Sequence, residues 1–212
     1  MRDLYLQINP SGWKMMRMRN RNTAFTSVLT KVLARDNNTC QFCGFIGIPK
    51  QMFVINLDGN YNNNNPNNLC CSCSICTRCV LIGSYEATDD QDSVERLIIC
   101  NELSQVQLNH IYRVLLASMS EPSLPQSEVA KTLFRSFRNR ANLVDEMFGA
   151  NASDTRVFSQ AVFDSGISDH KNLRQILQNL RYFPTRHSFF KEWSLWRSQL
   201  KQFKTKDIKM VF

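Results

Sequence analysis

Apolar and polar positions in the first half of the chain predict a helix, a strand and a long polar loop. In residues 23–35, apolar side chains recur every three or four positions, which is typical of a helix with one buried face. Residues 52–57 are rich in β-branched and apolar side chains and run into the turn sequence 58–60, so we expect a short hairpin there. Residues 60–69 hold seven asparagines and one proline, which indicates an exposed loop. The alternating apolar residues at 4–8 indicate a strand-like start.

The second half of the chain is patterned mainly as helices. Residues 96–100 have the composition of a strand that follows an acidic loop at 86–95. Ser104 and Gln107 form a capping-box sequence, which predicts a helix ending near Ser120. Further helices are expected around residues 129–137, up to Gly149, between Ser153 and Gly166, from Ser168 to Leu180 before Pro184, and from Thr185 onward. The last of them carries an apolar stripe that we interpret as core packing, made of Phe189, Phe190, Trp193, Trp196, Leu200 and Phe203.

Composition places the chain among folded proteins that do not insert into a membrane. Of the 212 residues, 43% are hydrophobic and 21% are charged, which is the balance of a globular protein. No apolar run approaches the ~18–20 residues that a membrane span requires, so no direct membrane insertion is expected. The N-terminal residues lack the apolar stretch of a secretory signal, and we therefore expect a cytoplasmic, reducing location.

Positive charge is concentrated toward both ends of the sequence. The formal net charge is +6 in residues 1–50, −4 in residues 51–180 and +6 in residues 181–212, which gives +8 overall. A basic excess attracts nucleic acids, anionic membranes or acidic proteins, and the charge alone does not choose among these partners. The simplest interpretation is a solvated basic surface.

Cysteine supplies the strongest chemical signal in the sequence. Seven of the eight cysteines lie between residues 40 and 79, and in a reducing compartment such clusters more often bind metal than form disulfides. Residues 40–44, Cys-Gln-Phe-Cys-Gly, are a zinc-knuckle sequence, because two thiolates separated by two residues reach one tetrahedral ion from a tight turn. We refer to these five residues as the knuckle. A second group of cysteines follows the polar loop, so zinc is the expected metal.

The register of that second group is ambiguous from spacing alone. The CxxC spacing occurs three times, as Cys70/Cys73, Cys73/Cys76 and Cys76/Cys79. A helix that begins just after the polar loop would present residues three apart to one ion, which favours Cys73 and Cys76. The predicted zinc ligands are therefore Cys40, Cys43, Cys73 and Cys76.

A site of four thiolates has a structural role rather than a catalytic one. Four protein ligands close the coordination shell, so a single structural Zn²⁺ without an open position for water is expected. A module of about 50 residues buries little apolar surface, and a structural zinc contributes ~10–16 kcal/mol of apparent binding energy to folding. The other thiols are interpreted as small buried or reduced groups, namely Cys70, Cys71, Cys79 and Cys100.

The order of the motifs resembles the zinc-stapled HNH endonuclease module, which has a treble-clef, ββα fold. The resemblance covers about residues 35–80, because Arg35-Asp36, the knuckle, Asn68-Leu69 and the Cys73/Cys76 pair occur in the usual order. HNH enzymes need a histidine at the end of the first hairpin strand to activate water, and residues 54–58 contain none. The histidines of this chain are His110, His170 and His187, all in the second half.

Two polar residues near the expected catalytic position do not replace that histidine. Asn56 cannot accept and hold a proton at neutral pH, and a positioned general base contributes typically ~10²–10⁴-fold in rate. Asp58 is interpreted as turn chemistry. No catalytic residue is therefore predicted.

A longer part of the chain resembles the DotN (IcmJ) family. The resemblance implies a non-enzymatic subunit of the Dot/Icm type IVB secretion system of host-infecting bacteria. Such a subunit binds the C-terminal tail of the inner-membrane coupling ATPase DotL, with the IcmS–IcmW adaptors as indirect partners. Cys70, Cys71 and the asparagine-rich loop depart from the family pattern. The similar stretches are RDNNTCQFCGF at 35–45, Val54, residues 56–59, Tyr61, the NNL sequence at 67–69, Cys73, Cys76, Cys79, FRSFRNR at 134–140, residues 146–149 and residues 164–166.

These observations together predict an α+β fold in two parts. We expect an HNH-like zinc-binding domain with an N-terminal helix at residues 1–101 and an all-helical domain at residues 102–212. The expected function is an assembly or adaptor subunit of the secretion coupling complex, not an enzyme. Two alternatives stay open. The first is an HNH-like nuclease or nucleic-acid-binding protein, although we expect no nucleic acid as a partner. The second is a thiol redox sensor acting through Cys70 and Cys71.

Overall fold

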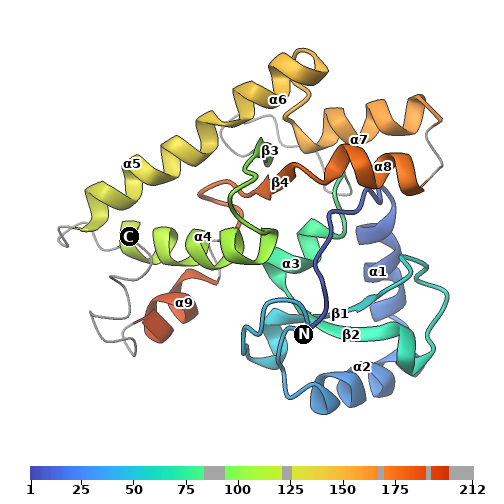
Figure 1. Ribbon diagram of the computed structural model, residues 1–212. Coiled ribbons are helices and arrows are strands. Elements are labelled where there is room, and N and C mark those ends of the chain that lie inside the picture. Colours follow the sequence, from blue (N-terminus) through green and yellow to red (C-terminus); the bar gives the residue numbers. More distant parts are fainter. Residues whose placement is uncertain (84–93, 121–125, 167–169, 190–191, 201–212) are drawn as a thin grey trace.

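The computed structural model describes residues 1–83, 94–120, 126–166, 170–189 and 192–200. Within these ranges the chain is a mixed α+β protein with two small antiparallel sheets among helices (Figure 1). Most of the expected acidic loop at 86–95 lies outside the described residues, as do Ser168, Phe190 and Phe203. None of the helices in the described part of the chain combines the length and apolar character that crossing a bilayer requires.

The first half of the chain packs two helices against a two-stranded sheet and adds a third, short helix. The strands pair antiparallel with Val54 opposite Cys71, and residues 57–68 connect them. The predicted helix at 23–35 and the predicted strand from residue 52 are confirmed, but the second strand begins only at Leu69, so the hairpin is wider than the turn sequence indicates. The elements are α1 (Gly12–Asn20), α2 (Thr23–Arg35), β1 (Met52–Asn56), β2 (Leu69–Cys73) and α3 (Ser74–Cys79), with short 3₁₀ turns at Pro49–Gln51 and Pro66–Asn68.

Helix α1 is not predicted by the sequence pattern, because its residues form no apolar stripe. Its stability comes from contacts that are distant in sequence: Met16 is buried, and Nη2 of the buried Arg19 donates to the Val54 carbonyl at 2.6 Å. Within the described ranges, the predicted strand before α1 is reduced to one isolated bridge, between Ile8 and Ile82. Long-range contacts therefore decide the structure of the first 20 residues.

The second half contains six helices in its described residues. The structure confirms two of the sequence signals for helix ends, the capping box at Ser104 and the glycine at position 149. The capping box is present, because Gln107 N donates to Ser104 Oγ at 3.2 Å while Ser104 N donates to Gln107 Oε1 at 2.9 Å. Gly149 follows α6 with φ of 106°, a conformation that favours glycine. The elements are β3 (Arg96–Ile99), α4 (Gln105–Met119), α5 (Gln126–Asn139), α6 (Ala141–Phe148), α7 (Thr155–Asp164), α8 (His170–Leu177), β4 (Leu180–Phe183) and α9 (Trp193–Leu200).

The prediction of an all-helical second half is wrong at β4. The helix expected to continue to Leu180 ends at Leu177, and Leu180–Phe183 pair antiparallel with β3. In this segment Leu180 and Tyr182 are buried and alternate with the more exposed Arg181. This alternation is typical of a strand, but it covers too few residues to be recognised in the sequence. The β3–β4 sheet joins residues on either side of position 101, and the division into two domains there stays a prediction.

The predicted last helix begins later than expected. Residues 186–189 form a turn, and α9 starts at Trp193. Phe189 and Trp196 of its apolar stripe are buried and pack around Tyr112, with ring centroids 5.9 and 6.3 Å from the Tyr112 ring. For these two residues the interpretation as core packing is confirmed.

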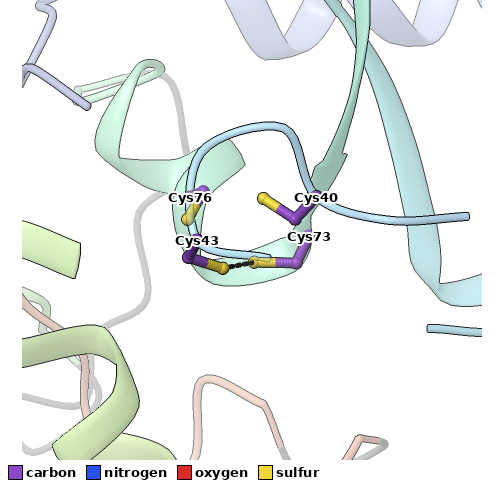
Figure 2. Close-up of side chains that lie close together, drawn as sticks. All are labelled: Cys40, Cys43, Cys73 and Cys76. Carbon is purple, nitrogen blue, oxygen red and sulfur yellow. Dashed lines mark hydrogen bonds between the residues drawn. The ribbon is translucent and has the colours of Figure 1, made fainter. Parts of the chain in front are cut away.

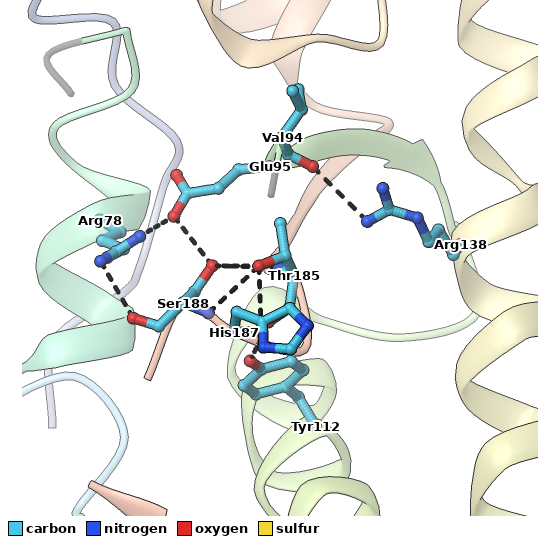
Figure 3. Close-up of polar contacts among 8 residues, drawn as sticks. All are labelled: Arg78, Val94, Glu95, Tyr112, Arg138, Thr185, His187 and Ser188. Carbon is cyan, nitrogen blue, oxygen red and sulfur yellow. Dashed lines mark hydrogen bonds and ion pairs between the residues drawn. The ribbon is translucent and has the colours of Figure 1, made fainter. Parts of the chain in front are cut away.

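A partly buried polar network connects α3 to the segment before α9. Arg78 of α3 forms an ion pair with Glu95, and Ser188 Oγ donates to the same carboxylate at 3.3 Å (Figure 3). Arg78 also donates to the Ser188 carbonyl at 3.1 Å, while Tyr112 Oη donates to the Thr185 carbonyl at 2.7 Å. The two halves of the chain are thus joined by hydrogen bonds as well as by the β3–β4 sheet.

Candidate metal centre

The structure brings together the four cysteines that spacing selects as zinc ligands. The Sγ atoms of Cys40, Cys43, Cys73 and Cys76 all lie within 4.8 Å of one another, and all four residues are buried. Figure 2 shows the four side chains converging from the knuckle and from the junction of β2 and α3. We refer to these four residues as the cysteine cluster.

The knuckle supplies two of these sulfurs because its backbone folds into a tight turn. Gly44 N donates to the Cys40 carbonyl at 2.9 Å, and Cys40 N donates to the Phe45 carbonyl at 2.8 Å. Gly44 has φ of 72°, a left-handed conformation in which glycine is favoured over residues with a Cβ. This turn places Cys40 and Cys43 side by side.

The other two sulfurs come from the start of α3. Cys73 is the last residue of β2 and the N-cap of α3, and Cys76 lies in the first turn of that helix. Residues three apart at a helix start point the same way, so both thiols face the knuckle. The expected helix after the polar loop is therefore present, although strand β2 precedes it.

The dimensions of the cysteine cluster fit a tetrahedral metal ion. With zinc–sulfur bonds of about 2.3 Å, neighbouring sulfurs of a tetrahedral site lie about 3.8 Å apart. The Sγ atoms of Cys43 and Cys73 are 3.7 Å apart. Four soft sulfur donors at this spacing suit Zn²⁺, and they would hold it with no position left for a substrate or water.

The remaining cysteines are buried but do not belong to the cysteine cluster. The cysteine cluster contains neither Cys70 nor Cys79. The competing pairs Cys70/Cys73 and Cys76/Cys79 therefore do not both face the knuckle. Burial raises the pKa of Cys70 and that of Cys71 to about 12, so both thiols are protonated at neutral pH. Because thiolates are the reactive form of cysteine, this environment disfavours a redox sensor built on these two residues.

Helix α4 of the second half contributes a polar shell around the sulfurs. Arg113 Nη2 donates to Cys73 Sγ at 2.8 Å and lies 3.6 Å from Cys43 Sγ, while Asn109 Nδ2 is 3.4 Å from Cys76 Sγ. Burial alone would lower the pKa of the Arg113 guanidinium, but the sulfurs of Cys73, Cys43 and Cys76 outweigh it and raise that pKa above its ordinary value. The cysteine cluster therefore lies against a permanent positive charge.

Sequence reasoning missed this shell, although a signal for it exists. Gln105, Asn109 and Arg113 recur every four residues along α4 and so form a polar stripe on one face of the helix. All three are buried in the structure, where an apolar stripe would be the usual pattern. A polar stripe within a helix that is otherwise rich in leucine indicates a buried polar partner.

Strand β1 ends at an asparagine whose side-chain amide is hydrogen-bonded through both its oxygen and its nitrogen. Asn56 is buried at the end of β1, and its Oδ1 accepts a hydrogen bond from Arg19 Nη1. Its Nδ2 donates to the Asn60 carbonyl at 3.0 Å and to the Asn63 carbonyl at 2.7 Å. Asn56 therefore organises the polar loop.

Asp58 has the turn role expected of it. Asn60 N, Asn63 Nδ2 and Asn68 Nδ2 donate to its carboxylate at 2.9, 2.7 and 2.9 Å. Burial would raise the pKa of Asp58, but the hydrogen bonds from Asn68, Asn63 and Asn60 outweigh it and hold the pKa below its ordinary value. This carboxylate is committed to the loop.

Asn56→Ala is expected to lower the free energy of unfolding by about 2 kcal/mol, because the buried Arg19 loses one acceptor and the Asn60 and Asn63 carbonyls each lose one of their two donors. Urea denaturation measures this loss. Asn62→Ala, a change in the same loop at an exposed residue, is the matched control and should change the free energy by no more than about 0.5 kcal/mol. Equal effects of the two substitutions would contradict the assigned role of Asn56.

Comparison with known proteins finds a relative that is similar over most of this chain. No family model matches the chain. The chain is 33% identical over 194 residues to the type 4 apparatus protein DotN of Legionella pneumophila. The aligned residues cover 92% of this chain and 89% of the relative. An alignment over 92% of the chain includes the cysteine cluster and helices α4 to α8.

Proposed function

Because the chain belongs to the DotN family of type 4 apparatus proteins, we propose that it is a non-enzymatic assembly subunit of a type IVB secretion coupling complex. In this role it binds the C-terminal tail of the coupling ATPase DotL and supports the recruitment and translocation of effectors. The IcmS–IcmW adaptors are indirect partners, reached through the ATPase. The protein acts in the cytoplasm, at the periphery of the inner membrane.

The observation that carries this proposal is the closed, buried cysteine cluster. Its sulfurs would hold one structural Zn²⁺, which supplies folding energy rather than a reactive water. The order β1–β2–α3 around the cysteine cluster supports descent from an HNH-like ββα module. The fully bonded Asn56 at the position of the missing histidine supports a scaffold that has no nuclease activity.

Association with the ATPase tail tests the proposed partner. Zinc-replete protein mixed with the DotL C-terminal tail should elute from a size-exclusion column as a 1:1 complex at moderate salt. A tail of the same composition in scrambled order is the control and should elute separately. Separate elution of the authentic tail under these conditions would overturn the proposed partner.

Plasmid nicking tests the absence of enzymatic activity. Purified protein incubated with supercoiled plasmid and Mg²⁺ or Mn²⁺ should leave the plasmid intact. Asp58 is the acidic residue closest to the HNH position in sequence. Nicking by the wild-type protein that disappears in Asp58→Ala would establish a nuclease instead.

A further inference from the structure

We infer that Arg113 is a positioning residue of the metal centre, which holds the thiolates by countercharge and couples metal binding to the docking of α4. The inference rests on the proposed zinc site and is independent of the proposed secretion partner. It assigns a role to a residue 37 positions beyond Cys76 in the sequence.

The first observation is that no carboxylate of the described residues lies within ion-pair distance of Arg113. The residue is 6% exposed, and no ion pair joins it to a carboxylate within the described ranges. Among the residues that the structure describes, its buried Nε and Nη1 atoms have no hydrogen-bond partner, and its polar contacts are those of Nη2 with Cys73 and Cys43. A buried guanidinium needs a nearby negative charge, and the sulfurs are the groups placed to supply it.

The second observation is that aromatic rings fix the guanidinium in this position. Its central carbon lies 4.5 Å from the centre of the Phe45 ring, next to the knuckle, and 5.8 Å from that of the Trp196 ring on α9. Both distances are within the range of cation–π attraction. Arg113 is therefore held between the knuckle and α9 with its Nη2 atom on the sulfurs.

The third observation is the charge of the centre itself. Metal-bound cysteines are thiolates, so four of them around one Zn²⁺ leave two negative charges uncompensated. Arg113 compensates part of this charge inside a site from which water is excluded.

The polar stripe of α4 extends the same connection to β4. Asn109 Oδ1 accepts from Gln105 Nε2 at 2.8 Å, which turns its Nδ2 toward Cys76. Gln105 in turn donates to the Tyr182 carbonyl at 2.9 Å and accepts from Tyr182 N at 2.8 Å. A continuous row of hydrogen bonds thus runs from the cysteine cluster through α4 to β4.

These contacts link metal occupancy to the packing of the second half. Coupling between two binding events is reciprocal. If metal binding strengthens the docking of Arg113 on the cluster by some factor, then docking of Arg113 increases the metal affinity by the same factor. Outer-shell partners of metal ligands typically change metal affinity by about 10- to 100-fold when they are replaced. We expect an effect of this size for Arg113.

The test compares Arg113→Met with Arg135→Met in the full-length protein. Both substitutions replace an arginine on a helix by an unbranched apolar residue, but Arg135 is exposed on α5. Competition with a chromophoric chelator should show about 10- to 100-fold weaker zinc binding for Arg113→Met and wild-type affinity for Arg135→Met. Arg113→Lys keeps the charge but loses the planar fork, and should fall between them.

A spectroscopic measurement separates this role from a general loss of packing. In cobalt-substituted protein, a hydrogen bond to sulfur lowers the energy of its lone pairs, so the sulfur-to-cobalt charge-transfer band should move to lower energy in Arg113→Met. The band should be unchanged in Arg135→Met. Wild-type affinity together with an unshifted band in Arg113→Met would overturn the inference.

Hydrogen exchange of the wild-type protein provides a test that needs no variant. Removal of zinc by a chelator should raise the exchange rate of amides in α4 and β4, and readdition of zinc should restore their protection. Unchanged protection of α4 in zinc-free protein would overturn the linkage. If the purified protein binds no zinc at all, the proposed cofactor fails together with this inference, whereas the DotL-tail experiment remains a separate test.

Discussion

Cys76→Ser is expected to abolish zinc binding and to unfold residues 35–80. Cys76 is completely buried in the first turn of α3, and a serine hydroxyl is too weakly acidic to replace its thiolate at neutral pH. A structural zinc contributes ~10–16 kcal/mol of apparent binding energy, which is similar in size to the ~5–15 kcal/mol of stability of a typical domain. Metal analysis should fall from one zinc per chain to none, and the cooperative thermal transition should be lost.

Two alanine variants control for the removal of a buried thiol. Cys70→Ala and Cys79→Ala remove the thiols of the competing CxxC registers, and both variants should keep one zinc per chain. Their thermal transitions should remain cooperative, although each loses some packing. If Cys79→Ala loses zinc while Cys76→Ser retains it, the ligand assignment moves to Cys79.

Glu95→Ala is expected to lower the free energy of unfolding by about 3 kcal/mol without changing the zinc content. The side chains of Arg78 and Glu95 are only 18% and 10% exposed, and the substitution removes the carboxylate from a largely buried ion pair. Removing one partner of a fully buried pair costs about 3–5 kcal/mol, and the small remaining exposure favours the lower end of that range. Ser188 Oγ also loses one of its hydrogen-bond partners and keeps the Thr185 hydroxyl.

Urea denaturation with Glu128→Ala as a matched variant measures this effect. Glu128 forms an ion pair with Lys131 on α5, but its side chain is 78% exposed, so its removal should change the free energy of unfolding by less than about 0.5 kcal/mol. Indistinguishable unfolding curves for the two variants would show that the Arg78–Glu95 network does not hold the two halves together.

The elements that the sequence predicts correctly are those whose own residues carry the pattern. Helix α2 has an apolar face that recurs with helical period, and α4 has its capping box. Helix α1 lacks such a face and depends on Arg19, whose partners Val54 and Asn56 lie 35 and 37 residues away. Strand β4 is four residues long and is defined by its pairing with β3, which local periodicity cannot show.

The same distinction applies to the metal site. The spacing of the cysteines, with the expected helix start, is enough to select the four residues that the structure brings together. Arg113 contacts Cys73 and Cys43 across 40 and 70 residues, so no short motif connects them. Its polar stripe along α4 indicates a buried partner but does not identify which one.

X-ray absorption at the zinc edge of the purified, full-length protein tests the central claim most directly, because it counts the atoms bound to the metal. Our account predicts four sulfur neighbours at about 2.3 Å and no nitrogen or oxygen neighbour in the first shell. A first shell with fewer than four sulfurs and a bound oxygen or nitrogen would contradict a closed, structural tetrathiolate centre.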